Sequence, residues 1–344
     1  MNENITVIIP VRDLSKYLFQ SVQVTLANTP VDVRIIVLTD CEVERPYVWD
    51  EARVQIMATG PVGPGAKRDF GVRACGTSIV AFLDDDAYPA VGWLGAAMAH
   101  FSDATVCAVG GPGVTPPEDP FWNQVSGAVF ASLAGSGGAR NRYVPVGTGA
   151  EVDDWPTVNL LVRRSAFDAV GGFNTDDFPG EDTKLCLALV EKLGMRIVYE
   201  PRAVVFHHRR PLFWKHFQQM GRYARCRGQF FRLHPRTSRR PLYALPSLLL
   251  LWTLFGVSYA CFARRSNVIA AIGLGCYGVL AVSAGVETLI RAKSLVLSLA
   301  TAMAVALTHV WYGVQFLRGL VVTRGDARPS TGGGVLEGEV RLQE

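Results

Sequence analysis

The sequence has no Asp or Glu between Arg202 and Val286, although it carries 30 acidic residues in all. Residues 201–250 hold 11 Lys and Arg, a net charge of +11, whereas residues 1–200 hold 15 Lys and Arg against 25 Asp and Glu. A basic block without acidic residues faces an anionic partner, either nucleic acid or lipid headgroups. The overall charge of +4 therefore combines an acidic N-terminal part with a basic block.

Other features are also absent. The seven Cys show no CxxC spacing, which favours reduced thiols. With 49% apolar residues and no periodic Gly or Pro, the chain is neither disordered throughout nor collagen-like. The apolar stretch within Met1–Pro10 is too short for a signal peptide and has no basic start, so we expect the acidic part to stay in the cytoplasm. Pro10–Ser15 lacks the Gly-rich phosphate loop that a nucleotidyltransferase would carry after its first strand.

Long hydrophobic runs are present instead. Residues 241–263, 266–286 and 294–317 contain no formal charge and are 23, 21 and 24 residues long. As helices they would each extend about 30 Å or more, enough to cross the hydrocarbon core of a bilayer. Three such runs in succession favour membrane helices over a buried hairpin in a soluble core. They also favour lipid headgroups over nucleic acid as the partner of the basic block.

These runs predict a membrane topology. The basic block beside the first run follows the positive-inside rule, which places residues 201–240 on the cytoplasmic face. Three full crossings would put the segment after Arg318 outside, and residues 321–344 have the composition of a disordered tail. Only Arg264 and Arg265 separate the first two runs, so one of these can instead be tilted or re-entrant.

Within residues 1–200, short β-branched runs alternate with helical stretches. The runs Ile5–Pro10, Val33–Leu38 and Ser78–Leu83 predict strands, and residues 14–28 and 65–75 predict the helices between them. The alternation predicts a parallel sheet with helices on both faces. Ligands of such sheets bind beyond the carboxyl ends of the strands.

The third of these strands ends at three consecutive acids, Asp84, Asp85 and Asp86. Like charges so close together raise one another's pKa unless a cation neutralises them. A divalent ion with oxygen ligands, Mn²⁺ or Mg²⁺, would also bridge to a diphosphate. A solvated turn is the alternative, because Asp and the nearby Pro89 both favour turns.

Ordered blocks over about residues 4–235 resemble the inverting family 2 glycosyltransferases. Besides the acidic run, they are Thr6–Arg12, Gly65–Gly71, Asn159–Asn174 and Gly180–Thr183. The resemblance implies an α/β fold in residues 1–208, a nucleotide-sugar-binding Rossmann-like domain of the glycosyltransferase A type. A basic, aromatic interfacial segment at 209–240 and C-terminal transmembrane helices at 241–320 would follow it.

The resemblance also implies roles for individual residues. Asp182 matches the general base that deprotonates the acceptor hydroxyl, and Glu181 would orient the acceptor or share the proton. The same pair can be an acidic first turn that complements a helix dipole. The implied metal contacts are Asp86 and Asp84. The residues implied to bind the nucleotide sugar are Pro10, Arg12, Asp40 at the nucleobase, Lys67, Arg68, Asp84 and Asp85.

Gln219, Arg222 and Tyr223 resemble the family's Gln-x-x-Arg-Trp motif, with Tyr in place of Trp. The motif implies that the Arg steadies the diphosphate while the aromatic ring faces the acceptor. Arg222 is also one of nine Arg between residues 209 and 240, so contact with lipid alone is the other interpretation. The surrounding stretch Phe213–Leu233 fits an interfacial amphipathic helix.

His207 and His208 follow the apolar stretch Ile197–Phe206, which we interpret as one strand. His207 either approaches the metal or the leaving phosphate, or it belongs to a packed histidine pair. Two departures from the family pattern leave donor and acceptor identity open. Asp69 stands where relatives often carry Asn, and Lys184 stands where an acid is frequent.

The order Gly221–Gly228, ending in Leu233–Pro235, most resembles members that extend lipid-linked oligosaccharides. It implies a multi-pass transferase of the cell membrane that moves one sugar from a nucleotide diphosphate, a UDP-sugar being favoured, to a polyprenyl-linked saccharide. The implied cofactor is Mn²⁺ or Mg²⁺. Two alternatives stay open: a polyprenyl-phosphate sugar synthase, and a non-catalytic membrane scaffold with a degenerate transferase domain. A processive synthase is disfavoured, because three short-looped spans offer little to line a channel.

Overall fold

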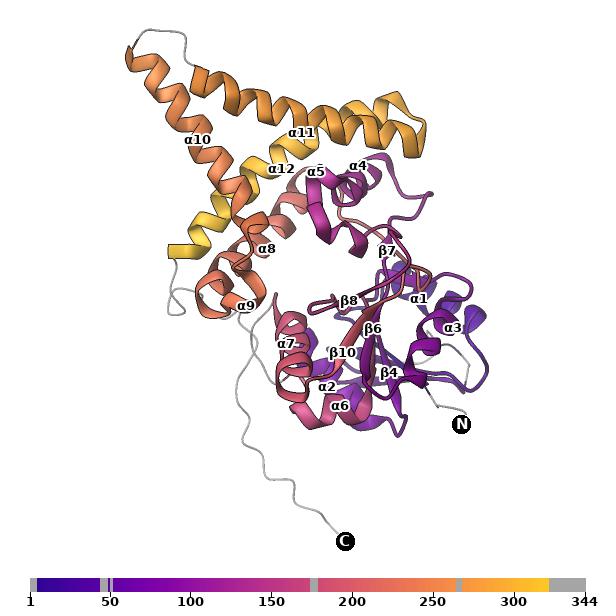
Figure 1. Ribbon diagram of the computed structural model, residues 1–344. Helices are drawn as coiled ribbons and strands as arrows, with labels where there is room; N and C mark the ends of the chain where they lie inside the picture. The colour runs from indigo at the N-terminus through magenta and orange to yellow at the C-terminus, as the bar shows by residue number, and fades with distance from the viewer. Residues whose placement is uncertain (1–4, 44–48, 50–51, 174–178, 264–267, 322–344) are drawn as a thin grey trace.

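The computed structural model describes residues 5–43, 49, 52–173, 179–263 and 268–321 (Figure 1). The predicted disordered tail lies outside the described residues from position 322 onward, and so do Arg264 and Arg265. An α/β domain forms the N-terminal part of the molecule. Long helices form the C-terminal part and lie to one side of the domain.

An eight-stranded sheet is the centre of the domain. Its strands run in the order β3 (Val54–Ala58), β2 (Arg34–Thr39), β1 (Ile5–Pro10), β4 (Ile79–Leu83), β9 (Asn159–Arg163), β6 (Val106–Gly110), β10 (Arg196–Tyr199) and β8 (Ala150–Val152). A smaller sheet orders β5 (Ala87–Pro89), β11 (Val205–His207) and β7 (Gly113–Val114). Strands β1, β2 and β4 are parallel neighbours, which confirms the arrangement predicted for the three β-branched runs.

The prediction of a parallel sheet is wrong beyond β4, because the sheet is mixed. Strand β9 runs antiparallel to both β4 and β6, and β8 runs antiparallel to β10. All of β9 except Arg163 is buried, so its sequence is an apolar run in either direction. After β6 the chain forms β7 in the smaller sheet and β8 at the edge of the large sheet, and it then returns between β4 and β6 as β9.

The sequence predicted one strand over the apolar stretch Ile197–Phe206, and this prediction is also wrong. The stretch contributes to β10 and β11, which belong to different sheets. Between them the Glu200 carboxylate accepts hydrogen bonds from the backbone N and the Nε of Arg202, both at 2.9 Å, and this closes a turn. His207 is consequently the last residue of β11 and pairs across the smaller sheet.

Helices cover both faces of the large sheet (Figure 1). One face carries α1 (Lys16–Asn28) and α3 (Trp93–Met98); the other carries α2 (Pro64–Ala74), α6 (Arg164–Val170) and α7 (Glu181–Leu193). Ser15 starts α1, because its Oγ accepts a hydrogen bond from Leu18 N at 3.2 Å. Pro64 starts α2, where its missing N–H leaves no helical bond unmade. Both helices lie within two residues of their predicted ends.

The C-terminal part consists of α8 (Trp214–Leu233), α9 (Pro235–Ser238), α10 (Pro241–Ala263), α11 (Val268–Ala292) and α12 (Leu295–Val321). Within the described residues, three helical segments are long and apolar enough to cross a membrane: Pro241–Phe262, Val268–Ala292 and Leu295–Val321. Helix α11 continues beyond Val286, the predicted end, because Glu287 and Arg291 pair across one turn at 2.8 Å. The short elements α4 (Phe121–Ala131), α5 (Leu133–Ser136) and the 3₁₀ turn η2 (Gly137–Arg142) lie beside these helices.

Helices α8 and α12 pack closely because glycines face each other. A Cβ added to Gly228 of α8 would stand 2.3 Å from Phe316 O of α12. We therefore expect Gly228→Ala to force the helices apart and to lower stability by about 1–3 kcal/mol. Thermal unfolding in detergent measures the loss. The matched control is Gly278→Ala in α11, where a Cβ meets nothing within 4 Å, and equal melting temperatures for the two variants would contradict the packing argument.

Candidate active site

The carboxyl ends of β1 and β2 place Asp40 beside Lys67 of α2. The Lys67 ammonium is buried and forms an ion pair with Asp40, and it also donates to the backbone O of Val11. Arg12 is exposed at the same edge, and Pro10 is buried as the last residue of β1. Lys67, which we expected to bind the nucleotide sugar, therefore has its partners inside the protein. It positions Asp40, whose side chain keeps 23% of its surface exposed.

Arg68, the next residue of α2, links two parts of the site. Its Nη2 lies 2.7 Å from Asp84 Oδ1, and its Nη1 lies 3.4 Å from Glu181 Oε1. The Arg68 side chain is 4% exposed, so its contribution is to hold these two carboxylates rather than to reach solvent. The sequence blocks that contain Asp84 and Glu181 are therefore joined through a buried guanidinium.

Asp84, Asp86 and His207 form a cluster that can hold a metal ion. Each offers one ligand atom, and these atoms lie within 4.8 Å of one another. The pairing of β5 with β11 sets Ala87 opposite His207, which brings the imidazole beside Asp86. His207 Nε2 lies 3.1 Å from Asp86 Oδ1. The side chains of the two acids remain about a third exposed, at 32% and 31%, so an ion can reach them.

The hydrogen-bond partner of His207 Nδ1 determines which nitrogen of the imidazole carries the proton. Arg209 Nη1 lies 2.8 Å from His207 Nδ1, and a guanidinium can only donate. Nδ1 therefore accepts, and Nε2 carries the proton and donates to Asp86. In this arrangement His207 orients Asp86 and leaves carboxylate oxygens of the two acids for a hard divalent cation.

Asp85 differs from its two neighbours in the acidic run. Burial raises its pKa to about 7, and the charges of Asp86 and Asp84 add to the effect. Burial also raises the pKa of Asp86, but His207, Arg210 and Arg209 more than offset this, so its pKa falls below the ordinary value. The cluster described above contains Asp84 and Asp86 but not Asp85.

Glu181 and Asp182 form the first turn of α7 and face different partners. Glu181 is buried against Arg68, and burial followed by the Asp182 charge raises its pKa to about 7. The Asp182 carboxylate is half-buried and accepts a hydrogen bond from Thr183 N at 2.8 Å. Burial and then the Asp154 charge raise its pKa. A carboxylate with a raised pKa at a helix N-terminus suits a general base, although the position also complements the helix dipole.

Helix α8 carries the Gln219, Arg222 and Tyr223 motif close to the start of α7. Farther along α8, Cys226 Sγ donates to Pro179 O at 3.0 Å. Gln219 Nε2 donates to Tyr223 Oη at 3.1 Å, and Arg222 is exposed beside them. Burial raises the pKa of the Tyr223 hydroxyl, and Tyr143, Asp182 and Asp84 add to the effect.

Sequence reasoning missed Asp154, which connects the domain to α8. Its Oδ2 lies 2.7 Å from Arg227 Nη2 and 3.2 Å from Arg142 Nη2, and its Oδ1 accepts from Thr183 Oγ1 at 3.1 Å. Burial raises the pKa of Asp154, but the two guanidiniums lower it by more, to well below its usual range. The sequence signal for this contact was Arg227 in the basic block. Asp154 lies 73 residues away from it in the chain, so the pair could not be recognised from the sequence.

Asp154→Asn is expected to cost about 3–5 kcal/mol of stability, because it leaves two buried guanidiniums without their carboxylate. The native pKa is lowered, so the contribution is complete above the unfolded value of about 3.9 and is lost as the pH falls below it. Melting curves of parent and variant should therefore converge at acid pH. The control is the neighbouring Asp153→Asn, an exposed residue paired with Arg240, and a similar loss there would contradict the assignment.

Asp69 shows why one departure from the family pattern is tolerated. Its Oδ1 accepts a hydrogen bond from Phe173 N at 3.0 Å, a role that the amide oxygen of Asn can also fill. Asp69 therefore joins α2 to Phe173.

Comparison with known proteins identifies the family. Residues 79–313 match the family described as glycosyl transferase family group 2. The chain belongs to this family. The match begins at β4, includes the acidic cluster and α7, and extends into α12, so it joins the domain to the long helices.

Two curated relatives of this glycosyltransferase have informative names. A pre-mycofactocin glycosyltransferase of Mycobacterium tuberculosis (strain CDC 1551 / Oshkosh) is 32% identical over 276 residues, covering 79% of this chain and 56% of the relative. The succinoglycan biosynthesis protein ExoA of Rhizobium meliloti (strain 1021) is 29% identical over 198 residues, covering 55% of this chain and 54% of the relative. The chain thus spans about half the length of these relatives.

A solved structure supports the fold assignment. The mannosyltransferase PcManGT from Pyrobaculum calidifontis, in complex with GDP-Man and Mn²⁺, is similar with a TM-score of 0.56. The similarity covers 90% of this chain and 88% of that one, at 19% sequence identity. It confirms the predicted α/β glycosyltransferase fold.

Proposed function

We propose that this family 2 glycosyltransferase transfers one sugar from a nucleotide diphosphate donor to a lipid-linked acceptor at a membrane surface. The observation that carries the proposal is the connection of the metal-ligand cluster to the acidic turn of α7 through Arg68. The two chemical requirements of the reaction, stabilisation of a leaving diphosphate and deprotonation of an acceptor, thereby lie on opposite sides of one buried guanidinium.

Asp84 and Asp86 would hold the divalent cation, and His207 would orient Asp86. When bound, the ion supplies positive charge to the donor diphosphate. Mn²⁺ is the proposed ion, because the similar mannosyltransferase was solved with Mn²⁺ and a nucleotide sugar. Asp40, which Lys67 holds at the end of β2, would contact the nucleobase.

Asp182 is the proposed base, which accepts the proton of the acceptor hydroxyl as that hydroxyl attacks the anomeric carbon. Its raised pKa makes it a stronger base than an ordinary Asp carboxylate. Glu181 is held by Arg68 and by the backbone N of Gly180 at 3.0 Å, so it positions the turn rather than exchanging a proton freely. Tyr223 and Arg222 of α8 would line the acceptor side.

The proposed acceptor is a polyprenyl-linked saccharide, and the proposed location is the cytoplasmic face of the cell membrane. Support comes from the three apolar helices and from the basic helix α8 that joins them to the domain. The name of ExoA, a succinoglycan biosynthesis protein, agrees with an acceptor in surface polysaccharide synthesis. A lipid phosphate acceptor is the other outcome that the experiment must separate.

The test is incubation of membranes that contain the protein with labelled nucleotide sugars and a polyprenyl-lipid extract, followed by mass analysis of the lipid products. A lipid-linked saccharide longer by one sugar is the expected product. Sugar attached directly to a lipid phosphate would replace the acceptor assignment while leaving the transferase proposal intact. Label incorporation that Asp182→Asn leaves unchanged would contradict the proposed site.

A further inference from the structure

The three apolar helices are not equivalent in how they meet the domain. Helices α10 and α11 lie together where Gly273 of α11 packs against Thr253 of α10, and they diverge toward the domain (Figure 1). The start of α10 contacts α8, where the Tyr243 ring lies 4.9 Å from the guanidinium of Arg227, the residue that pairs with Asp154 of the domain. Each of the two helices therefore has one end at the domain and one end away from it.

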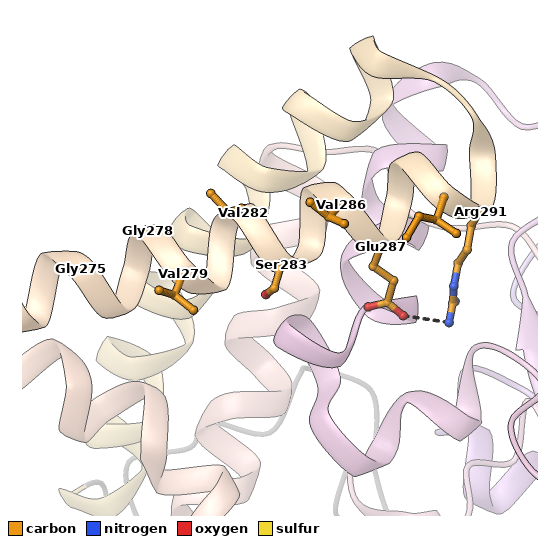
Figure 2. Close-up of a pocket in the computed structure, with 9 residues that line it drawn as sticks. Gly275, Gly278, Val279, Val282, Ser283, Val286, Glu287 and Arg291 are labelled. Atoms are coloured by element: carbon orange, nitrogen blue, oxygen red, sulfur yellow. Dashed lines mark ion pairs between the residues drawn. The ribbon is translucent and has the colours of Figure 1, made fainter.

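The end of α11 is fixed to the domain by a charged group. Glu287 Oε2 accepts from Leu133 N at 2.9 Å, and Glu287 Oε1 lies 2.6 Å from Arg140 Nη2. Figure 2 shows Glu287 and Arg291 paired at this end of α11. The preceding turns of α11 line an apolar groove with Gly275, Gly278, Val279, Val282 and Ser283. The charged end lies at the domain surface, and the apolar part extends away from it.

Helix α12 instead contacts α4, α5 and α8 along its length. Its second half lies beside α8 and makes polar contacts with it: His216 Nε2 to Thr308 Oγ1 at 3.0 Å, Trp311 Nε1 to Phe217 O at 2.6 Å, and Arg225 Nη1 to Gln315 Oε1 at 3.0 Å. The close approach of Gly228 and Gly319 continues the contact to the last turn. Residues 308–319 of α12 thus lie at the same depth as residues 216–228 of α8.

That depth cannot be the hydrocarbon core. Helix α8 carries five Lys and Arg and no acid among its 20 residues, and charged side chains at a bilayer centre are costly. A basic helix of this kind lies in the headgroup layer. The second half of α12, packed along it, must lie there too.

The first half of α12 is held at the same level. It begins two residues after Lys293, directly beyond the charged end of α11 that is fixed to α5 and η2. In the middle of α12, His309 Nε2 pairs with the backbone O of Ala134 at 2.8 Å. The start and the middle of α12 are thereby placed beside α5 and η2, and its last turn beside α8.

We propose that α12 lies along the bilayer surface without crossing it, and that α10 and α11 form the membrane-inserted hairpin. Helices of 23 and 25 residues extend about 35 Å, enough to cross once each. One stripe of α12 remains exposed to lipid, formed by Val296, Leu299, Met303, Leu307 and Val310. The segment after α12 is then on the same side of the membrane as the catalytic domain. This topology goes beyond the proposed function and does not depend on the donor or the acceptor.

The test compares two tags on the full chain, one before Met1 and one after Glu344, in sealed inside-out and right-side-out vesicles treated with protease. Both tags should be digested completely in one orientation and protected completely in the other. Three crossings, which the lengths of the hydrophobic runs alone predict, would give opposite results for the two tags and would overturn the proposal.

A third position tests the hairpin. Ser266→Cys, between α10 and α11, is treated with a membrane-impermeant maleimide, with the parent chain as background for its seven native Cys. Labelling above background should occur only from the side opposite to the tags. Labelling from the same side as the tags, or none above background from either side, would show that the hairpin does not cross.

Discussion

Asp86→Asn should abolish most metal-dependent turnover, with kcat/KM falling about 10²–10³-fold. The substitution keeps the size of the side chain but removes the charge that holds a cation beside the donor diphosphate. Mn²⁺ binding, measured by calorimetry on the purified protein in detergent, should weaken at least about tenfold, since one charged ligand is lost. This second measurement separates loss of the ion from loss of folding.

The matched control is Asp168→Asn, which removes an exposed carboxylate paired with Arg164 on α6. Its metal binding and turnover should equal those of the parent. If Asp86→Asn bound Mn²⁺ as well as this control does, the ion would have to lie elsewhere, and the assignment of the acidic cluster would be wrong.

Asp182→Asn should lower kcat about 10²–10⁴-fold with little change in the KM of the donor, because only proton removal from the acceptor is lost. The raised pKa of Asp182 has a further consequence for the parent enzyme. A base must be deprotonated to act, so the acid limb of its pH–rate profile should lie above about 3.9, the ordinary pKa of Asp. The limb is measured as kcat/KM against pH at saturating Mn²⁺.

Glu181→Gln provides the comparison at the neighbouring position. Glu181 is buried against Arg68, so we expect this substitution to loosen the turn and to reduce kcat less than Asp182→Asn does. A larger loss in Glu181→Gln, together with an acid limb that moves only in that variant, would exchange the roles of the two carboxylates.

The sequence predicted the first half of the domain well because local signals set it. The β-branched runs became β1, β2 and β4 within one or two residues, and Ser15 and Pro64 fixed where α1 and α2 begin. The direction of β9 could not be predicted, because its buried residues Asn159–Val162 form the same kind of run in either direction.

The sequence indicated residues for the candidate site but not the contacts that each of them makes. The motif containing Lys67 and Arg68 was assigned to the donor, yet both side chains are buried and hold carboxylates in place. The sequence alone does not show whether a basic residue in a motif contacts a ligand or a neighbouring acid. The contact of Arg227 with Asp154 was hidden for a related reason, because a basic block suggests a uniform lipid-facing surface.

The hydrophobic runs were recognised from length and charge alone, and this also limited what they could show. The run that became α12 is as long as the other two, but buried polar residues such as Thr308 and Gln315 have partners on α8. Those partners become visible only once the helices are placed together.

The most direct test of the account is Mn²⁺-dependent nucleotide release by the detergent-purified protein across a panel of UDP-, GDP- and dTDP-sugars, with and without membrane lipid extract. We expect one donor to be consumed only with the metal, release to increase with lipid, and activity to be lost in Asp86→Ala and Asp182→Ala. Consumption that is independent of Mn²⁺, or equal in parent and both variants, would contradict the claim that this acidic cluster is the active site of a glycosyltransferase.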